Sequence, residues 1–296
     1  MTETTGIEEL IRVAREKLEE RREEIVRLCA DLVAARSVNP PGDTREVAAI
    51  VADALARGGI PSRFERRDET MPSVVAELDS GRPGPHLVLN VHLDTMPAGD
   101  ESSWSVPPYE LTRRDGRLYG LGMGNMKGSV AAMIHAARLL REHGEAWNGR
   151  VTFTALSDEV VFGENGAAHL LRSLPDLAGD GVLCGEGPGF KRLSIAEKGV
   201  LWLRLSAVGA AGHSSSVKRL GSATARLAEV IARVDRLNGT RIEAPEELRG
   251  LFDSGDPGFE LTANVGTVRA GTFVGQVAVE GTAEIDLRIP PGLTID

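Results

Sequence analysis

Apolar residues recur with helical spacing over the first part of the chain. Between residues 7 and 35 they come every three or four positions, which predicts an amphipathic helix or a pair of helices. The segment 37–42, Ser-Val-Asn-Pro-Pro-Gly, ends this pattern because a proline pair cannot continue a helix. A second helix is expected over 44–58, and strands are expected around 63–66 and 73–78.

Three short apolar runs predict the strands of a buried sheet. Residues 86–92, 151–156 and 182–184 suit strands that are covered on both faces in an α/β fold. Helical spacing over 126–143 and 166–173 places helices between them. In open α/β sheets ligands bind at the carboxyl ends of the strands, so the residues that follow each run are candidates for chemistry.

The pattern changes in the last third of the chain. Residues 201–208 alternate between apolar and polar, 223–237 have helical spacing, and 263–268 and 276–287 have the pattern of strands. This order predicts a small α+β domain whose sheet has one solvated or partner-facing side. A further helix and strand would complete a split β-α-β fold, so this domain is expected to be incomplete in the 296 residues.

Composition and charge exclude several classes of partner. The chain has 42% hydrophobic residues and a formal net charge of −9, with acidic and basic residues mixed and no basic block. This argues against a surface for nucleic acid or an anionic membrane and favours a small-molecule partner. The charged N-terminus has no apolar signal segment and no run could span a bilayer, so a cytoplasmic location is expected. Cys29 and Cys184 fit no metal-binding spacing and are expected to be small core residues.

Candidate chemical groups follow each of the three apolar runs. His92 and Asp94 end the first, Glu159 follows the second and Glu186 follows the third. A carboxylate two positions from a histidine on one strand face can hold the ring nitrogen that does not bind a metal. A His-x-Asp pair alone is a weak signal, since a structural histidine at a strand end would look the same.

Further motifs make the pattern specific. After His92 come Trp104, Pro107-Pro108, the segment 115–128 (Asp-Gly-Arg-Leu-Tyr-Gly-Leu-Gly-Met-Gly-Asn-Met-Lys-Gly) and the segment 209–215 (Gly-Ala-Ala-Gly-His-Ser-Ser). In this order and spacing they resemble the zinc-dependent aminoacylase and carboxypeptidase family, which includes succinyl-diaminopimelate desuccinylase, acetylornithine deacetylase and glutamate carboxypeptidase. The resemblance extends over nearly the whole chain.

The resemblance implies a two-domain α/β architecture. Residues 1–189 would form the N-terminal part of a zinc-exopeptidase-like catalytic domain, with helices on both faces of a mixed sheet. Residues 190–296 would form an inserted, ferredoxin-like α+β lid or dimerisation domain, incomplete here. Three explanations of the missing part stay open: a fragment, a separate polypeptide that supplies the rest, or a protein that has become smaller.

The resemblance also implies a role for each candidate in the first domain. Family members hold two zinc ions between carboxylates and histidines, and a separate glutamate activates the attacking water. His92 and Glu186 match ligands of one metal, and Asp94 matches the carboxylate that orients His92. Glu159 matches the general base.

Two residues of the second domain match substrate-binding positions of the family. His213 matches a histidine that reaches the site of the neighbouring subunit, which implies a homodimer through this domain. Arg288 matches an arginine that receives a substrate carboxylate through its guanidinium fork. The implied substrate is an N-acyl amino acid or a small peptide.

Two substitutions alter the metal-binding pattern of the family. Asn125 replaces the bridging aspartate, and Val160 replaces the second of two consecutive glutamates. The last metal histidine of the family belongs to a C-terminal segment that these residues do not contain. Two divalent ions about 3.5–4 Å apart repel by roughly 17–19 kcal/mol at an effective dielectric of 20, and a neutral amide offsets this less than a carboxylate would. We therefore expect one Zn²⁺ rather than two, with Co²⁺ or Mn²⁺ as alternatives, held by His92, Glu186 and the Asn125 oxygen.

The leading hypothesis is a metal-dependent hydrolase of an amide bond. The rival is a catalytically inactive relative that binds an amino-acid-like ligand or partners an active subunit, and a third reading is amide formation. Lys127, next to the candidate ligand Asn125, either orients the turn before the predicted helix or is solvated.

Overall fold

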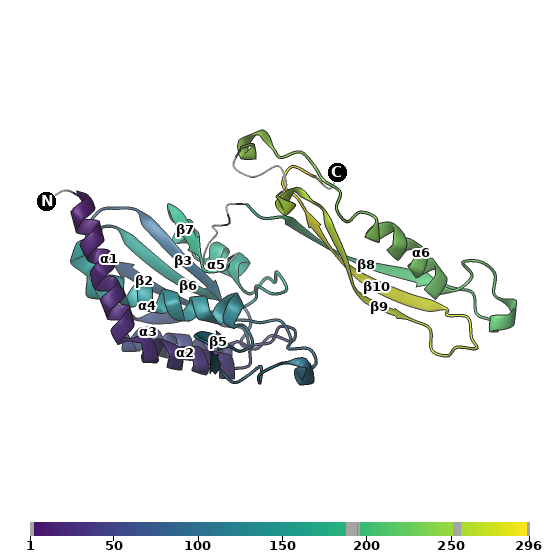
Figure 1. The fold of residues 1–296 in the computed structure, drawn as a ribbon, viewed down its shortest axis with the longest axis horizontal. Coiled ribbons are helices and arrows are strands. Elements are labelled where there is room, and N and C mark those ends of the chain that lie inside the picture. Colours follow the sequence, from purple (N-terminus) through teal and green to yellow (C-terminus); the bar gives the residue numbers. More distant parts are fainter. Residues whose placement is uncertain (1–2, 188–193, 195, 251–255, 295–296) are drawn as a thin grey trace. The chain divides into compact units, whose positions relative to one another are not determined.

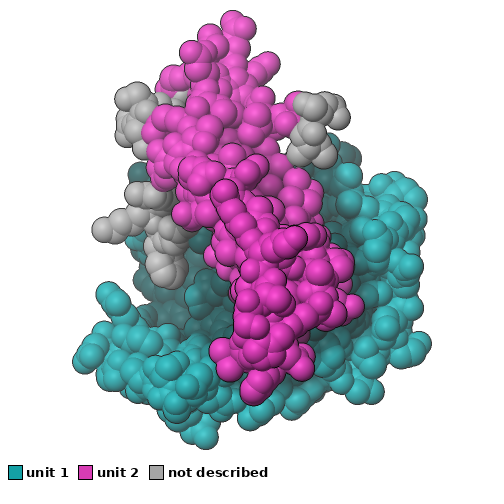
Figure 2. All heavy atoms as spheres, turned by 90° about the vertical axis from the view of Figure 1, so that its right-hand side faces the viewer, with its two compact units in different colours: residues 1–192 teal, residues 193–296 magenta. Residues whose placement is uncertain are grey.

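The computed structural model describes residues 3–187, 194, 196–250 and 256–294. The chain divides into two compact units, residues 1–192 and 193–296 (Figure 2). The domain boundary that the sequence predicts, between residues 189 and 190, lies outside the described residues. Each unit is described by itself below.

Unit 1 is built from a sheet and the helices that pack on it (Figure 1). Its helices are α1 (Glu3–Glu20), α2 (Arg22–Ala34), α3 (Arg45–Arg57), α4 (Gly128–Glu142) and α5 (Ala167–Ser173). Its strands are β1 (Ser62–Glu65), β2 (Ser73–Asp79), β3 (His86–His92), β4 (Thr112–Arg114), β5 (Arg117–Tyr119), β6 (Arg150–Leu156) and β7 (Gly181–Cys184). These elements lie close to the positions that apolar spacing predicts, and the hairpin of β4 and β5 is an addition.

Strand direction brings three strand ends together. The five-stranded sheet has the order β1-β2-β6-β3-β7. β3 runs parallel to β6 and to β7, with His92 opposite Leu156 and Asn90 opposite Cys184. β2 is antiparallel to β1 and β6, so the sheet is mixed. Because β6, β3 and β7 are neighbours and parallel, the residues that follow them meet at one edge of the sheet.

Helices cover both faces of this sheet. Side chains alternate along β2, where Val74 and Ala76 belong to the core formed with α2, α3 and α4. Val75, between them, packs on the opposite face with Leu170 of α5. The expected α/β class, with helices on both faces of a mixed sheet, is therefore confirmed.

The edge strand β7 differs from its prediction. Val182 is 59% exposed and Leu183 is 47% exposed, and the thiol of Cys184 is exposed as well. The expectation that both cysteines are core residues is wrong for Cys184 and right for Cys29 on α2, which is 3% exposed. The reason is the position of β7, which pairs with β3 on one side and is the outermost strand of the sheet.

A tight turn replaces the start of the predicted helix 126–143. Residues Met123–Lys127 form a kinked turn, η2, in which the backbone angles of Asn125 and Met126 are not helical, and the regular helix α4 begins only at Gly128. Gly122 precedes the turn with a φ of 82°, a conformation that favours glycine. A Cβ at Gly122 would also lie 2.8 Å from the Thr95 side chain, so glycine lets this turn approach the end of β3.

Unit 2 contains a smaller antiparallel sheet. Its elements are β8 (Gly199–Val208), α6 (Ala223–Asp235), β9 (Thr262–Ala270) and β10 (Glu280–Ile289), and the sheet order is β8-β10-β9. The helix α6 packs on the sheet, where Ala283 and Ile285 of β10 and Leu227 of α6 are buried. The predicted strand 276–287 begins later than expected, at Glu280. No helix in the described ranges is long and apolar enough to cross a bilayer.

The buried thiol of Cys29 makes a prediction about stability. Burial raises its pKa from an ordinary value of 9.0 to about 11, so the folded chain holds this proton more tightly than the unfolded chain does. The thiol therefore contributes stability that is fully present below about pH 9 and is lost as the pH rises through about 11. Relative to Cys29→Ala, the free energy of unfolding of the wild type should fall by about 2 kcal/mol between pH 8 and pH 11.

Chemical denaturation at the two pH values measures this difference. The matched control is Cys184→Ala, which removes an exposed thiol and should leave the pH dependence of the wild type unchanged. A constant difference between wild type and Cys29→Ala at both pH values would contradict the burial of this thiol.

Candidate metal centre

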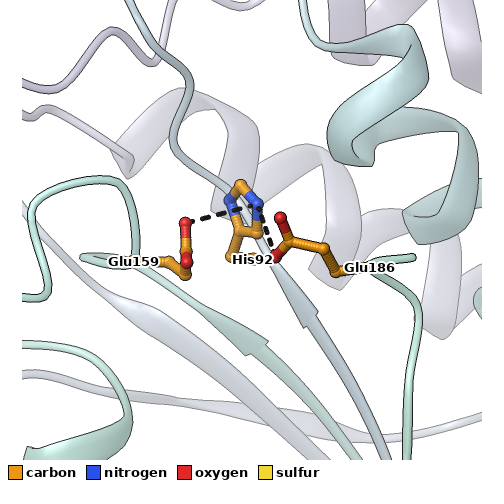
Figure 3. Close-up of side chains that lie close together, drawn as sticks. All are labelled: His92, Glu159 and Glu186. Atoms are coloured by element: carbon orange, nitrogen blue, oxygen red, sulfur yellow. Dashed lines mark ion pairs between the residues drawn. The ribbon is translucent and has the colours of Figure 1, made fainter. Parts of the chain in front are cut away.

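Three side chains that could bind a metal converge at the ends of the parallel strands. His92 ends β3, Glu159 follows β6 and Glu186 follows β7, and one ligand atom of each lies within 4.8 Å of the others. Nε2 of His92 is 3.6 Å from Glu159 Oε2 and 3.8 Å from Glu186 Oε2. Figure 3 shows the two carboxylates on either side of the imidazole ring. An imidazole and two carboxylates are a donor set that suits Zn²⁺.

The three groups differ in their access to solvent. The His92 side chain is 3% exposed, whereas those of Glu159 and Glu186 are 33% and 36% exposed. The buried ring is therefore fixed by its surroundings, while the two carboxylates border on solvent. A small molecule can reach the carboxylates without unfolding of the strands.

Asp94 lies behind the ring and joins it to the loop after β6. Its Oδ1 is 3.3 Å from Nδ1 of His92. The backbone N–H groups of Glu159 and Val160 donate to its two oxygens at 3.1 Å and 3.0 Å. The buried Asp94 carboxylate thus faces the Nδ1 side of the imidazole and also holds the backbone of Glu159 in place.

Neighbouring groups set the protonation of His92 and Asp94. Burial of the His92 ring opposes a positive charge, but the carboxylates of Asp94 and Glu159 favour it more strongly, so the pKa of His92 is raised. Burial acts to raise the pKa of Asp94, but hydrogen bonds from His92, Asn39 and the Val160 N–H outweigh it, so the pKa of Asp94 is lowered. A cation that binds Nε2 has to displace a proton from the ring.

The amide of Asn125 lies between His92 and Glu186. Its Oδ1 is 2.8 Å from Nε2 of His92, and its Nδ2 donates to Oε1 of Glu186 at 2.7 Å. An amide oxygen only accepts, so Nε2 carries a proton in this arrangement. The Asn125 amide is thus hydrogen-bonded to His92 and to Glu186, the two residues that would bind a metal. Asn125 belongs to η2, the glycine-flanked turn that sits against the end of β3.

Two buried polar residues near the centre are not among the site residues that the sequence predicts. Asn39 is 2% exposed and its Nδ2 donates to Asp94 Oδ2 and to Asp158 Oδ1, both at 2.9 Å. It belongs to the proline-rich segment 37–42, which the sequence pattern predicts only as the end of a helix. A signal for this role in the sequence is the amide residue itself, which stands directly before two prolines in a loop that does not otherwise require a buried side chain.

The second such residue is Lys127. It is 2% exposed and its Nζ donates to the carbonyl of Ala35, just after the end of α2, at 2.9 Å. Burial lowers its pKa to about 8. The alternative that Lys127 is solvated is therefore wrong, and the other alternative, that it orients the turn, agrees with this contact because it ties η2 to α2.

The substrate-binding candidates lie in the other unit. Nδ1 of His213 is 2.9 Å from Ser215 Oγ, and Nε of Arg288 donates to Asp286 Oδ2 at 2.9 Å. Both residues belong to unit 2, whereas His92, Glu159 and Glu186 all belong to unit 1. Their roles stay predictions of the sequence.

Comparison with known proteins identifies a family. The model of "Peptidase family M20/M25/M40" matches residues 88–288. A probable succinyl-diaminopimelate desuccinylase of Staphylococcus epidermidis is 33% identical over 193 residues, which is 64% of this chain and 45% of the relative. A protein of the same name from Staphylococcus aureus is 32% identical over 195 residues, 65% of this chain and 46% of the relative. The chain spans about half the length of these curated relatives.

Solved structures share the fold at lower identity. A metallo-carboxypeptidase of the M20 family from Sulfolobus solfataricus has a TM-score of 0.75 at 19% identity and covers 91% of this chain and 72% of its own. Human carnosine dipeptidase 1 has a TM-score of 0.69 at 18% identity, with 95% and 73% covered. A dinuclear metal binding peptidase from Bacillus subtilis has a TM-score of 0.57 at 14% identity, with 93% and 66% covered.

The family match and the fold lead to one assignment. The family model extends over more than half of the chain, and its range includes His92, Glu159 and Glu186. The sequence resemblance to zinc-dependent aminoacylases and carboxypeptidases is therefore confirmed. This chain belongs to peptidase family M20/M25/M40.

Proposed function

We propose that this chain is a metal-dependent hydrolase that cleaves the amide bond of an N-acyl amino acid or a small peptide. The observation that carries the proposal is the convergence of His92, Glu159 and Glu186 at three adjacent strand ends. The names of the relatives support an amide bond as the target, since they include a desuccinylase, a carboxypeptidase and a dipeptidase. The acyl group and the amine are left open.

The metal would be held by His92 and Glu186, with the Asn125 oxygen as a further ligand. When bound, a zinc ion acts as a Lewis acid on the scissile carbonyl and lowers the pKa of a coordinated water. Asp94 keeps the His92 ring oriented, because it faces Nδ1 and leaves Nε2 toward the two glutamates. This arrangement fixes the side of the ring that is offered to a cation.

Glu159 would be the general base. Its carboxylate is partly exposed and near Nε2 of His92, and its backbone is held by Asp94. In amide hydrolysis Glu159 takes a proton from the attacking water as the new C–O bond forms. It then returns that proton to the amine as the C–N bond breaks.

We propose that the centre holds one ion rather than two. Val160 gives Asp94 its backbone N–H, and its hydrocarbon side chain cannot bind a second ion. Asn125 supplies a neutral amide between His92 and Glu186, which cannot offset the repulsion of two divalent ions as a carboxylate would.

One observation favours a second candidate function. The Asn125 amide accepts a hydrogen bond from His92 and donates one to Glu186, so both residues have a partner without a cation. This suits a catalytically inactive relative that binds an amino-acid-like ligand or partners an active subunit. A panel of acetyl, succinyl and formyl amino acids with added zinc or cobalt separates the two, since release of amine from any of them requires an enzyme.

We further propose that unit 2 serves as a lid or dimerisation domain. The support is its three-stranded sheet, in which β8 and β9 are outermost and carry backbone groups open to another strand. His213 would then act in the site of a second copy, and Arg288 would bind a substrate carboxylate. A cytoplasmic location stays a prediction.

The role of Glu159 is tested by Glu159→Gln. The amide keeps the size of the side chain but cannot take a proton, so the turnover number should fall by about 10²–10⁴-fold while zinc affinity changes little. Initial rates with the best substrate of the panel, and zinc titration, measure the two effects. The matched control is Glu164→Gln on the same loop, where the side chain pairs with Arg172 and turnover should be kept. Full activity of Glu159→Gln would remove Glu159 from its role.

The number of ions is tested by metal analysis. Protein purified without added zinc should contain no more than one tightly held ion per chain, because Val160 and Asn125 remove two charged ligands. Elemental analysis after extensive dialysis gives this number. Two retained ions per chain would contradict the proposal.

The effect of the neutral amide is tested by Asn125→Asp. The aspartate lacks the N–H group that Asn125 donates to Glu186, and it adds a negative charge. The variant should therefore bind zinc about tenfold or more tightly than the wild type does. Competition with a chromophoric chelator measures the dissociation constant. Asn264→Asp, on β9 of unit 2, adds the same charge at an exposed position and controls for the change in net charge. Equal affinity of wild type and Asn125→Asp would show that the amide does not limit metal binding.

A further inference from the structure

Asn39 holds two buried carboxylates through a single nitrogen. Its Nδ2 donates one N–H to Asp94 Oδ2 and the other to Asp158 Oδ1, each at 2.9 Å. Asp94 is 1% exposed, Asp158 is 4% exposed and Asn39 itself is 2% exposed. A buried carboxylate needs hydrogen-bond donors to remain stable.

The backbone of Asn39 is fixed to the end of β3. Its N–H donates to the carbonyl of Thr95 at 2.9 Å, and the Thr95 N–H donates to the carbonyl of Ser37 at 2.9 Å. The Ser37 hydroxyl donates to the carbonyl of Leu93 at 2.7 Å. Residues 37 to 39 are thus hydrogen-bonded alongside residues 93 to 95 like a short strand. These bonds fix the backbone from which the Asn39 side chain extends.

The two carboxylates serve different parts of the centre. Asp94 faces His92 Nδ1 and accepts the backbone N–H of Glu159. Asp158 accepts both the backbone N–H and the side-chain Nδ2 of Asn165 on its Oδ2, at 3.1 Å and 2.9 Å, and so closes the loop after β6. Asn39 is the group that connects the support of the imidazole with the support of the loop.

The residue type at this position follows from the geometry. Two carboxylates that approach the same nitrogen repel each other, and a neutral group with two N–H donors can satisfy both. Serine has one donor and aspartate has none when ionised, so neither can make both bonds.

We propose that Asn39 is a positioning residue of the metal centre, which holds Asp94 behind His92 and the Glu159 loop beside it by donating one N–H to each aspartate. This proposal deepens the proposed function and rests on it for the role of the metal. It adds a residue that touches neither a ligand atom nor the general base and acts through Asp94 and Asp158.

The experiment compares Asn39→Ala with Asn165→Ala in the full chain. Each variant removes a donor from Asp158, but only Asn39→Ala removes one from Asp94. Titration with zinc alone, in competition with a chromophoric chelator, should give a dissociation constant about tenfold or more higher for Asn39→Ala. Asn165→Ala should stay within about threefold of the wild type, and Asn39→Ser, with one donor, should lie between them.

The ring of His92 gives a second measurement that does not need metal or activity. The ¹⁵N resonances of its ring nitrogens, assigned by their loss in His92→Ala, should shift in Asn39→Ala and stay in place in Asn165→Ala. Asn39→Ser provides the same comparison if the alanine variant does not fold.

The outcomes separate this proposal from the proposed function. Zinc affinity and His92 resonances that are unchanged in Asn39→Ala would overturn the role of Asn39, as would equal effects of Asn39→Ala and Asn165→Ala. A wild type that binds zinc and hydrolyses no member of the substrate panel would overturn the proposed function and leave the Asn39 comparison complete.

Discussion

The geometry of the centre depends on the hydrogen bonds that end on the carboxylate of Asp94. This group accepts from the Asn39 amide and from the backbone N–H groups of Glu159 and Val160, and it faces Nδ1 of His92. These contacts come from the segment before α3, from the end of β3 and from the loop after β6. A buried charge with this many donors has a low pKa and a fixed position. The position of the His92 imidazole and the position of the loop that carries Glu159 therefore both depend on Asp94, although His92 and Glu159 are 67 positions apart in the sequence.

The main elements and the three clustered residues could be predicted because they follow from regular patterns. Parallel neighbouring strands bring their carboxyl ends together, so the apolar runs that precede Glu159 and Glu186 and end at His92 indicate a common edge of the sheet, and the family resemblance implies the role of each residue. The contacts of Asn39 and Lys127 could not be predicted in this way. Each is a polar side chain in an irregular segment, and its burial depends on tertiary packing that has no period in the sequence. The exposure of Cys184 has a similar origin, since an edge strand and a central strand can have the same apolar run.

The amide of Asn125 changes the charge and the hydrogen bonding of the centre. A carboxylate at this position would repel Glu186 unless a cation lay between them, whereas the amide donates to Glu186 and accepts from His92. The site is then internally satisfied, and a cation has to compete with formed hydrogen bonds and with a proton on the ring. If the centre binds a metal as proposed, Asn125 is therefore expected to weaken that binding.

The position of Glu186 after an edge strand has a kinetic consequence. β7 is a four-residue strand that, in the part of the chain that the structure describes, pairs only with β3, and its end is held by the bonds of Gly185 to Asn90 and Ser129. His92, by contrast, follows a strand with partners on both sides. Short outer strands open with less free energy than the whole domain needs to unfold. Fraying of β7 would withdraw one carboxylate while the imidazole stays in place, so we expect an ion bound at the proposed centre to leave by way of this ladder.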